Sequence, residues 1–152
     1  MEALVVYYSR TNITEKLAGE IADKADADLE KVTTSVNYSG KIGYARAGKD
    51  AMTEKEVEIG SLKYDPADYD TVYIGTPVWA SRAASPIISY IKQNKDKIKN
   101  VKFFATAGKS GFDDTFSQME KYVTKSPQKT LALTTKEVKG NDYGEKLTAF
   151  LE

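Results

Sequence analysis

Two patterns of apolar residues follow each other repeatedly along the chain. Short runs rich in Val, Ile, Phe, Tyr and Thr are typical of strands, and runs that are apolar throughout indicate strands buried on both faces of a sheet. We expect five strands, at residues 3–8, 29–34, 71–76, 101–106 and 129–135, of which the stretch 29–34 shows only a weaker, alternating pattern.

Between these runs, apolar residues recur every three to four positions, which is typical of amphipathic helices. Helices are expected over residues 15–24, from Ser85 into the lysine-rich stretch that ends at Lys99, from Asp113 or Asp114 to Ser126, and over residues 141–151. Ser85 is the expected N-cap of its helix, with Pro86 at the first helical position. Residues 38–53 contain three glycines and are expected to form a loop with a short helix near its end.

Strands that alternate with helices along the whole chain predict a parallel sheet covered by helices on both faces. Five strands in 152 residues fit a single domain, residues 1–152, with an α/β fold of the doubly wound, three-layer sandwich type. In such sheets, ligands bind beyond the carboxyl ends of the strands where the strand order reverses. The loops that begin at Ser9, Pro77 and Thr106 are therefore the candidate functional loops.

The composition limits the chemistry that side chains can supply. The chain is 41% hydrophobic and 29% charged, and 22 basic residues balance 22 acidic ones, which gives no chain-wide basic field for nucleic acid. There is no Cys and no His, so thiolate nucleophiles, imidazole bases and metal sites held by these residues are excluded. We therefore expect no catalytic residue and no metal, and any chemistry should come from a bound cofactor.

Targeting signals are not recognisable in the sequence. No segment has the apolar length that a bilayer span requires. The start, Met1-Glu2-Ala3, lacks the basic region of a signal peptide. We expect a cytoplasmic protein with no membrane partner.

The first candidate loop is crowded with short polar side chains. Its residues are Ser9, Arg10, Thr11, Asn12, Ile13 and Thr14, and they lie between a strand and a helix. One interpretation is an ordinary helix cap, for which a single residue suffices. The other is a phosphate cradle, because free N–H groups at a helix N-terminus stabilise an anion and short hydroxyls can donate to it.

The other two loops each allow a structural and a functional interpretation. The second, Pro77-Val78-Trp79-Ala80, holds the only Trp, which either packs over the sheet end or offers a flat face to a planar ligand. The third, Thr106-Ala107-Gly108, is either a plain turn or a place where backbone approaches a ligand closely. A planar, phosphorylated cofactor would use all three loops, and flavin mononucleotide (FMN) has that shape.

With these loops, the chain resembles the flavodoxins over its full length. The stretch "YYSRTNITE" resembles the phosphate loop of the family, usually (S/T)-x-T-G-N-T, while "IGTPVWASRAASP" and "FFATAGKSG" resemble its second and third flavin loops. The resemblance implies a five-stranded parallel sheet of order 2-1-3-4-5 and bound FMN. By the same resemblance, Ser9 and Thr11–Thr14 would bind the FMN phosphate. Pro77–Ala80 would meet the flavin ring, with Trp79 stacked on it, and Thr106–Gly108 would line the pyrimidine side of the ring.

Several residues depart from the family pattern. Asn12 stands where the family usually has Gly, but Asn tolerates a positive φ better than other residues with a side chain. Ala80 makes a peptide flip beside the flavin costlier than Gly would. Arg10, Arg82 and Lys109 place positive charge in the three loops, and from this we expect a less negative reduction potential than acidic flavodoxins have.

The resemblance implies one-electron transfer between redox partner proteins by a monomer. Two alternatives remain open at this point: an NAD(P)H-dependent flavin or quinone reductase on the same fold, and a binding module without cofactor. The sequence therefore leaves enzymatic activity undecided. Residues 38–63 form either a flap near the ring or a surface loop.

Overall fold

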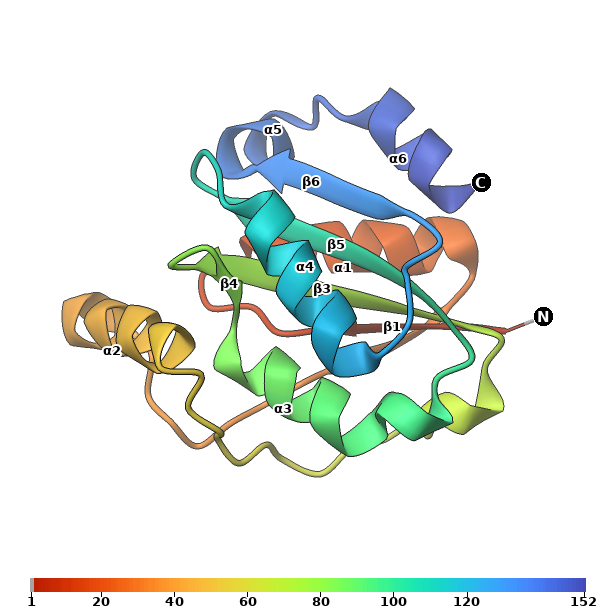
Figure 1. Cartoon of the computed structure of the whole chain (residues 1–152). Coiled ribbons are helices and arrows are strands. Elements are labelled where there is room, and N and C mark those ends of the chain that lie inside the picture. Colours follow the sequence, from red (N-terminus) through yellow and green to blue (C-terminus); the bar gives the residue numbers. More distant parts are fainter. Residues whose placement is uncertain (1) are drawn as a thin grey trace.

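Strands and helices alternate along the chain in the computed structural model, which describes residues 2–152 (Figure 1). The strands are β1 (Ala3–Tyr7), β2 (Asp28–Lys31), β3 (Thr71–Trp79), β4 (Arg82–Ala83), β5 (Asn100–Ala107) and β6 (Thr130–Thr134). The helices are α1 (Ile13–Ala25), α2 (Gly40–Met52), α3 (Ser85–Asn94), α4 (Phe112–Val123), α5 (Thr135–Gly140) and α6 (Gly144–Leu151), with short 3-10 helices η1 (Pro66–Asp68) and η2 (Lys95–Lys97).

Five strands form a parallel sheet of order β2-β1-β3-β5-β6, and β4 pairs antiparallel with the end of β3. Without β4, this is the expected order 2-1-3-4-5, so the α/β doubly wound fold is confirmed. The strand order reverses at β1, which lies between β2 and β3. The carboxyl ends of β1, β3 and β5 therefore lie side by side at one edge of the sheet.

Side chains that alternate along the strands divide the core into two layers. Leu4 and Val6 of β1 pack with residues of α2, α3 and α4, whereas Val5 and Tyr7 pack with residues of α1, α5 and α6. Figure 1 shows α4 in front of the sheet, α1 behind it, and α2 set apart at one end. The sandwich thus has three layers, as expected.

Strand β3 continues beyond Pro77, where the sequence predicted that it would stop. β1 has already ended opposite Gly75, so at Pro77 the strand is an edge on that side and the missing N–H is tolerated there. The extra length lets β3 turn back into β4, a strand that the sequence analysis missed. Strand β2 begins at Asp28 and ends at Lys31, earlier than expected.

Several helix boundaries also differ from the prediction; α3, for example, ends at Asn94 rather than at Lys99. Ala84 rather than Ser85 is the N-cap of α3, and Gly111, with φ of 96°, is the N-cap of α4. The expected caps of α4, Asp113 and Asp114, lie in its first turn, where the helix dipole favours negative charge. The helix expected over residues 141–151 begins later, as α6 at Gly144, and the sequence analysis missed α5, which a capping box between Thr134 and Glu137 starts.

The prediction for residues 38–53 was wrong, because α2 is a helix of 13 residues rather than a loop. Its glycines suggested turns, but Gly43 serves close packing. A Cβ at Gly43 would lie 2.1 Å from the carbonyl carbon of Tyr38, so only glycine fits without a shift of the backbone. The helix is thereby seated against the segment that precedes it.

Candidate cofactor site

The three candidate loops meet at one edge of the sheet. The Tyr8 and Trp79 rings pack edge to face with centroids 5.6 Å apart, which joins the first loop to the second. The hydroxyls of Thr14 and Thr106 lie 2.8 Å apart and join the first loop to the third. The structure thus brings together the residues that the sequence analysis assigned to one site.

The first loop presents free backbone N–H groups at the N-terminus of α1. Asn12 is the N-cap and has φ of 70°, the left-handed conformation expected of it, and its side chain makes no capping hydrogen bond. Within residues 2–152, the N–H groups of residues 10–14 donate to no acceptor. Because the dipole of a 13-residue helix also makes this end partly positive, the loop can bind an anion.

The hydroxyls of the loop are arranged differently from a simple cap. Ser9 Oγ accepts a hydrogen bond from the Glu15 N–H at 3.2 Å, so the capping side chain is Ser9 and its own proton is free to be donated. Thr14 and Thr106 are almost fully buried, and one of their two hydroxyls donates to the other. The proton of the accepting hydroxyl is not used in this bond. Thr11 is exposed to solvent. The loop therefore combines a capping side chain with hydroxyl donors that are not used by the cap.

Arg10 reaches toward α2. Its Nε donates to the Tyr38 carbonyl at 2.7 Å and its guanidinium donates to the Gly40 carbonyl at 3.0 Å. The same guanidinium lies 5.3 Å from the centre of the Tyr44 ring, in reach of a cation–π contact. Arg10 thus ties the first loop to the start of α2, a role that its sequence context did not suggest.

Trp79 is held between two tyrosines. Besides the Tyr8 contact, its ring meets Tyr38 at 4.8 Å between centroids and at an interplanar angle of 60°. Only 8% of Trp79 is exposed, so the structure packs much of this side chain against the protein. Such edge contacts fix the ring orientation, each worth about 0.5–1.5 kcal/mol beyond buried area.

A cavity of about 230 Å³ lies beside Trp79, between α2 and the β3–β4 hairpin. Its lining consists of Tyr44, Ala45, Ala47, Gly48, Val78, Trp79 and Ala80. The lining carries no charged side chain and combines two aromatic residues with small ones. Such a space suits an apolar, planar group.

The third loop completes the edge of the site. Thr106 and Ala107 end β5 and are buried, whereas Gly108 is exposed and has open space where a Cβ would lie. Lys109 is also exposed, and Arg82 donates to the Ala80 carbonyl at 3.2 Å. A Cβ at Gly111 would lie 3.0 Å from Val78 Cγ1, so this glycine permits the close approach of the third loop to the second.

The sequence analysis missed the contribution of Tyr8 and Tyr38. The Tyr38 hydroxyl donates to the buried Asp50 carboxylate of α2 at 2.7 Å. Burial and this bond together raise the pKa of Tyr38, and burial raises the pKa of Tyr8. These phenols therefore stay neutral at physiological pH, and they anchor α2 and Trp79 without titrating.

The turn between β3 and β4 is strained. Ala80 has φ of 51° and Ser81 has φ of 62°, so two consecutive residues with side chains occupy the left-handed region. This conformation suits a two-residue hairpin turn, for which Asn-Gly is preferred. The left-handed region costs about 1–2 kcal/mol for such a residue.

Ala80→Gly is therefore expected to raise the free energy of unfolding by about 0.5–1 kcal/mol, because relief of the left-handed conformation outweighs the extra entropy of glycine in the unfolded chain. The control is Ala45→Gly, the same change in the exposed interior of α2, which should lower it by about 1 kcal/mol. Urea unfolding measures both. Destabilisation by Ala80→Gly would contradict the strain.

Two features are absent from residues 2–152. No helix in that range has both the length and the apolar character needed to cross a membrane. The same residues contain no group of three or more Asp, Glu, His or Cys side chains placed to hold a metal ion.

Comparison with known proteins places this geometry in context. The flavodoxin family profile matches residues 2–150. No curated protein matches the sequence. The structure of a flavoprotein in complex with FMN from Lactobacillus acidophilus has a TM-score of 0.75 and 25% identity, and the match covers 91% of this chain and 97% of that one.

Two other solved structures extend the comparison. The apo form of the flavoprotein from Lactobacillus acidophilus has 25% identity and a TM-score of 0.63, with 91% of this chain and 95% of that one covered. An NADPH-quinone reductase from P. pentosaceus has a TM-score of 0.54 at 11% identity, with 99% of this chain and 96% of that one covered. The match to the quinone reductase shows only that the two proteins share a fold.

Proposed function

The chain belongs to the flavodoxin family, and we propose that it binds FMN non-covalently and carries electrons between redox partner proteins. The observation that carries this proposal is the pairing of an anion cradle with an aromatic-lined cavity at adjacent strand ends. The N–H groups of residues 10–14 have no acceptor in the described chain, and the cavity beside Trp79 is uncharged. These features fit the phosphate and the ring of one FMN molecule.

Each loop has a part in holding the cofactor. The N–H groups of Thr11, Asn12, Ile13 and Thr14 and the hydroxyls of Ser9 and Thr11 would bind the phosphate. The residues expected against the ring are Pro77, Val78, Trp79 and Ala80, with Thr106, Ala107 and Gly108 at its pyrimidine side. Bound there, FMN supplies the redox chemistry.

The chain's own residues bind, orient and shield rather than catalyse. Tyr8 and Tyr38 hold Trp79 in place, and Arg10 joins the phosphate loop to α2. With no His or Cys in the chain, the site offers no side chain that exchanges protons near pH 7 by its ordinary pKa. This set of roles suits an electron carrier better than an acid–base enzyme.

The comparison with the Lactobacillus acidophilus flavoprotein supports a site formed for FMN. That protein was solved in complex with FMN, and at 25% identity the match covers 91% of this chain and 97% of that one.

A second candidate function is an NAD(P)H-dependent flavin or quinone reductase. The observation that favours it is the cationic rim formed by Arg10, Arg82 and Lys109, since a pyridine nucleotide carries phosphates. The shared fold of the P. pentosaceus quinone reductase is compatible with it.

The purified, FMN-loaded protein distinguishes the two functions. With NADPH or NADH as the sole reductant and a quinone as acceptor, an electron carrier should oxidise the nucleotide no faster than free FMN does. After reduction with dithionite, it should still pass electrons to cytochrome c. Multiple turnovers of NAD(P)H by the protein alone would favour the reductase and overturn the carrier.

A further inference from the structure

Helix α2 carries most of the large apolar side chains that the folded protein exposes. Ile42, Tyr44 and Met52 are 79%, 70% and 61% exposed, and among residues 2–152 the other such side chain is Leu29, at 39%. Exposed apolar side chains usually occur singly on a monomer's surface, whereas a group of them marks an interaction site. Three on one 13-residue helix therefore point to contact with another molecule.

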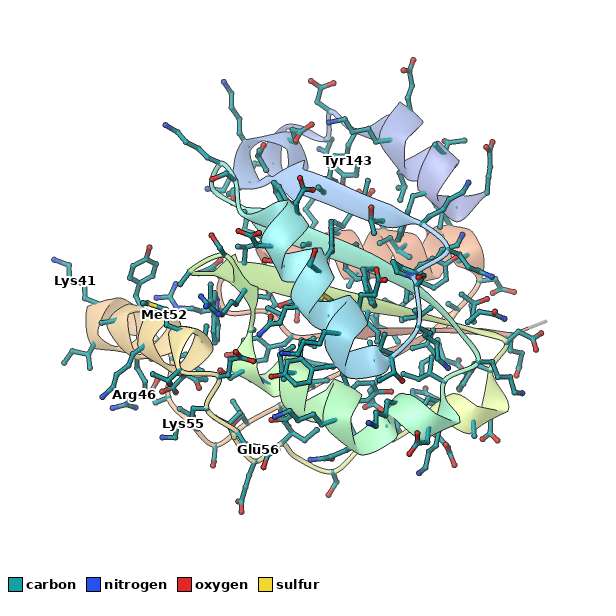
Figure 2. All side chains as sticks on the ribbon, in the orientation of Figure 1. Lys41, Arg46, Met52, Lys55, Glu56 and Tyr143 are labelled. Carbon is teal, nitrogen blue, oxygen red and sulfur yellow. The ribbon has the colours of Figure 1, made fainter. Side chains whose placement is uncertain are left out.

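The exposed charges of the same helix are all positive. Lys41, Arg46 and Lys49 are exposed, while the single acid of the helix, Asp50, is 4% exposed and accepts from the Tyr38 hydroxyl. Figure 2 shows Lys41 projecting from α2 away from the rest of the molecule, whereas the guanidinium of Arg46 donates to the Asn37 carbonyl at 3.2 Å and stays exposed. Because the whole chain has zero net charge, this positive field is local. It attracts a negatively charged surface.

Cations and apolar side chains are interleaved around α2. At 3.6 residues per turn, the order around the helix axis is Tyr44, Lys41, Met52, Lys49, Ile42, Arg46. These six residues are called the α2 patch below. A helix that lies in a membrane interface needs one continuous apolar face, which this order does not provide. Apolar contacts surrounded by charges are instead typical of an interface between proteins.

The α2 patch adjoins the candidate cofactor site. Arg10 bonds to the carbonyl of Gly40 at the start of α2 and lies over the Tyr44 ring. Tyr44, Ala45 and Gly48 line the cavity that Trp79 and Ala80 line from the other side. A molecule docked on α2 therefore lies next to that cavity.

We propose that the α2 patch docks a redox partner protein whose contact surface carries Asp and Glu side chains around an apolar centre. The inference rests on the proposed electron-carrier function. Lys41, Arg46 and Lys49 steer the acidic partner, and Ile42, Tyr44 and Met52 make the apolar contact. The docked partner is then positioned for electron transfer from the neighbouring site.

Cytochrome c offers two probes of opposite charge for this docking, the native basic protein and its succinylated, acidic form. FMN-loaded protein is reduced with dithionite and mixed with each ferric form in a stopped-flow instrument. Each transfer moves one electron from the reduced flavin to the haem iron, which becomes ferrous. With the acidic form, the rate constant should fall about tenfold or more as salt rises from about 10 mM to about 500 mM, because salt screens attraction.

Two triple variants with the same change in charge locate the effect. Lys41→Glu/Arg46→Glu/Lys49→Glu should lower the low-salt rate with acidic cytochrome c about tenfold or more. The control changes three lysines at the opposite end of the sheet, Lys95→Glu/Lys97→Glu/Lys99→Glu, and should lower that rate at least about threefold less than the α2 variant does, because its charges lie farther from the docked partner and are screened more. The docking site is overturned if the rate constant with acidic cytochrome c does not depend on salt, or if both triple variants lower that rate constant equally.

A binding readout keeps this inference separate from the proposed function. In NMR spectra of the labelled protein without added flavin, succinylated cytochrome c should shift the amide signals of α2 more than those of η2. Chemical-shift changes spread evenly over the surface would overturn the docking site. The same holds if the protein co-sediments with phosphatidylglycerol vesicles and the α2 triple variant does not, because the α2 patch would then bind a membrane surface. Failure to bind FMN overturns the proposed function instead, whatever the NMR result.

Discussion

Gly43→Ala is expected to lower the free energy of unfolding by about 1–3 kcal/mol, since overpacking of a close contact costs that much. The new Cβ would lie 2.1 Å from the carbonyl carbon and 2.4 Å from the carbonyl oxygen of Tyr38, and both are backbone atoms that cannot move alone. The shift would also disturb the Arg10 bond to that carbonyl and the Tyr38–Asp50 bond. FMN affinity should fall with stability, because Tyr38 supports Trp79.

Gly48→Ala is the matched control on the same helix. A Cβ at Gly48 would meet nothing within 4 Å, so the change should raise the free energy of unfolding by up to about 1 kcal/mol through helix propensity. Urea denaturation of both variants measures the difference. If the two variants are equally stable, α2 is not seated on Tyr38 as the structure has it.

Stability should stay level from about pH 6 to about pH 9 and fall steeply above about pH 10, because the chain has no His or Cys and its tyrosines are mostly buried. Burial raises the pKa of seven tyrosines in the folded protein: Tyr7, Tyr8, Tyr38, Tyr69, Tyr73, Tyr90 and Tyr143, the last to about 12. Above their ordinary pKa of 10.0, these phenols ionise in the unfolded chain first, which favours unfolding.

Each phenol that stays protonated only in the folded state removes about 1.4 kcal/mol of stability per pH unit. Lys102 acts in the opposite direction, because burial lowers its pKa and deprotonation then favours the folded state as pH rises. One lysine cannot offset seven tyrosines. Unfolding by urea at a series of pH values from about 6 to about 11 measures the profile, and level stability through about pH 11 would contradict it.

Tyr90→Phe tests one contributor to this profile. The Tyr90 side chain is fully buried and its hydroxyl has no hydrogen-bond partner within residues 2–152. Its removal should raise stability at neutral pH by about 1–3 kcal/mol and make the alkaline decline shallower. A variant less stable than the wild type at pH 7 would indicate a partner that the structure does not contain.

The sheet and the position of the site could be predicted from the sequence, because their signals are local. Apolar runs indicated the central strands β1, β3 and β5, a weaker alternating pattern indicated β2, and parallel strands bring their carboxyl ends to one edge. Asn12, the residue that departed from the family pattern, takes the left-handed conformation expected of it. Thr14 and Thr106, far apart in sequence, meet as the predicted loops required.

What lay beyond prediction depends on contacts that only the folded structure shows. The length of α2 was hidden by its glycines, since only the position of the Tyr38 carbonyl reveals that Gly43 is a packing residue. The roles of Tyr8 and Tyr38 likewise follow from their distance to Trp79. The capping box of Thr134 and Glu137, in contrast, was legible as T-x-x-E and could have indicated α5.

The most direct test of the account is a comparison of FMN with riboflavin, which has the same ring but lacks the phosphate. Titration of the apoprotein, followed by quenching of flavin fluorescence, gives both dissociation constants. FMN should bind about 100-fold tighter or more, because two hydrogen bonds to a charged group contribute about 3 kcal/mol. Thr11→Ala should weaken FMN and leave riboflavin unchanged. Equal affinity for FMN and riboflavin, or no quenching by either, would contradict a phosphate cradle at residues 9–14.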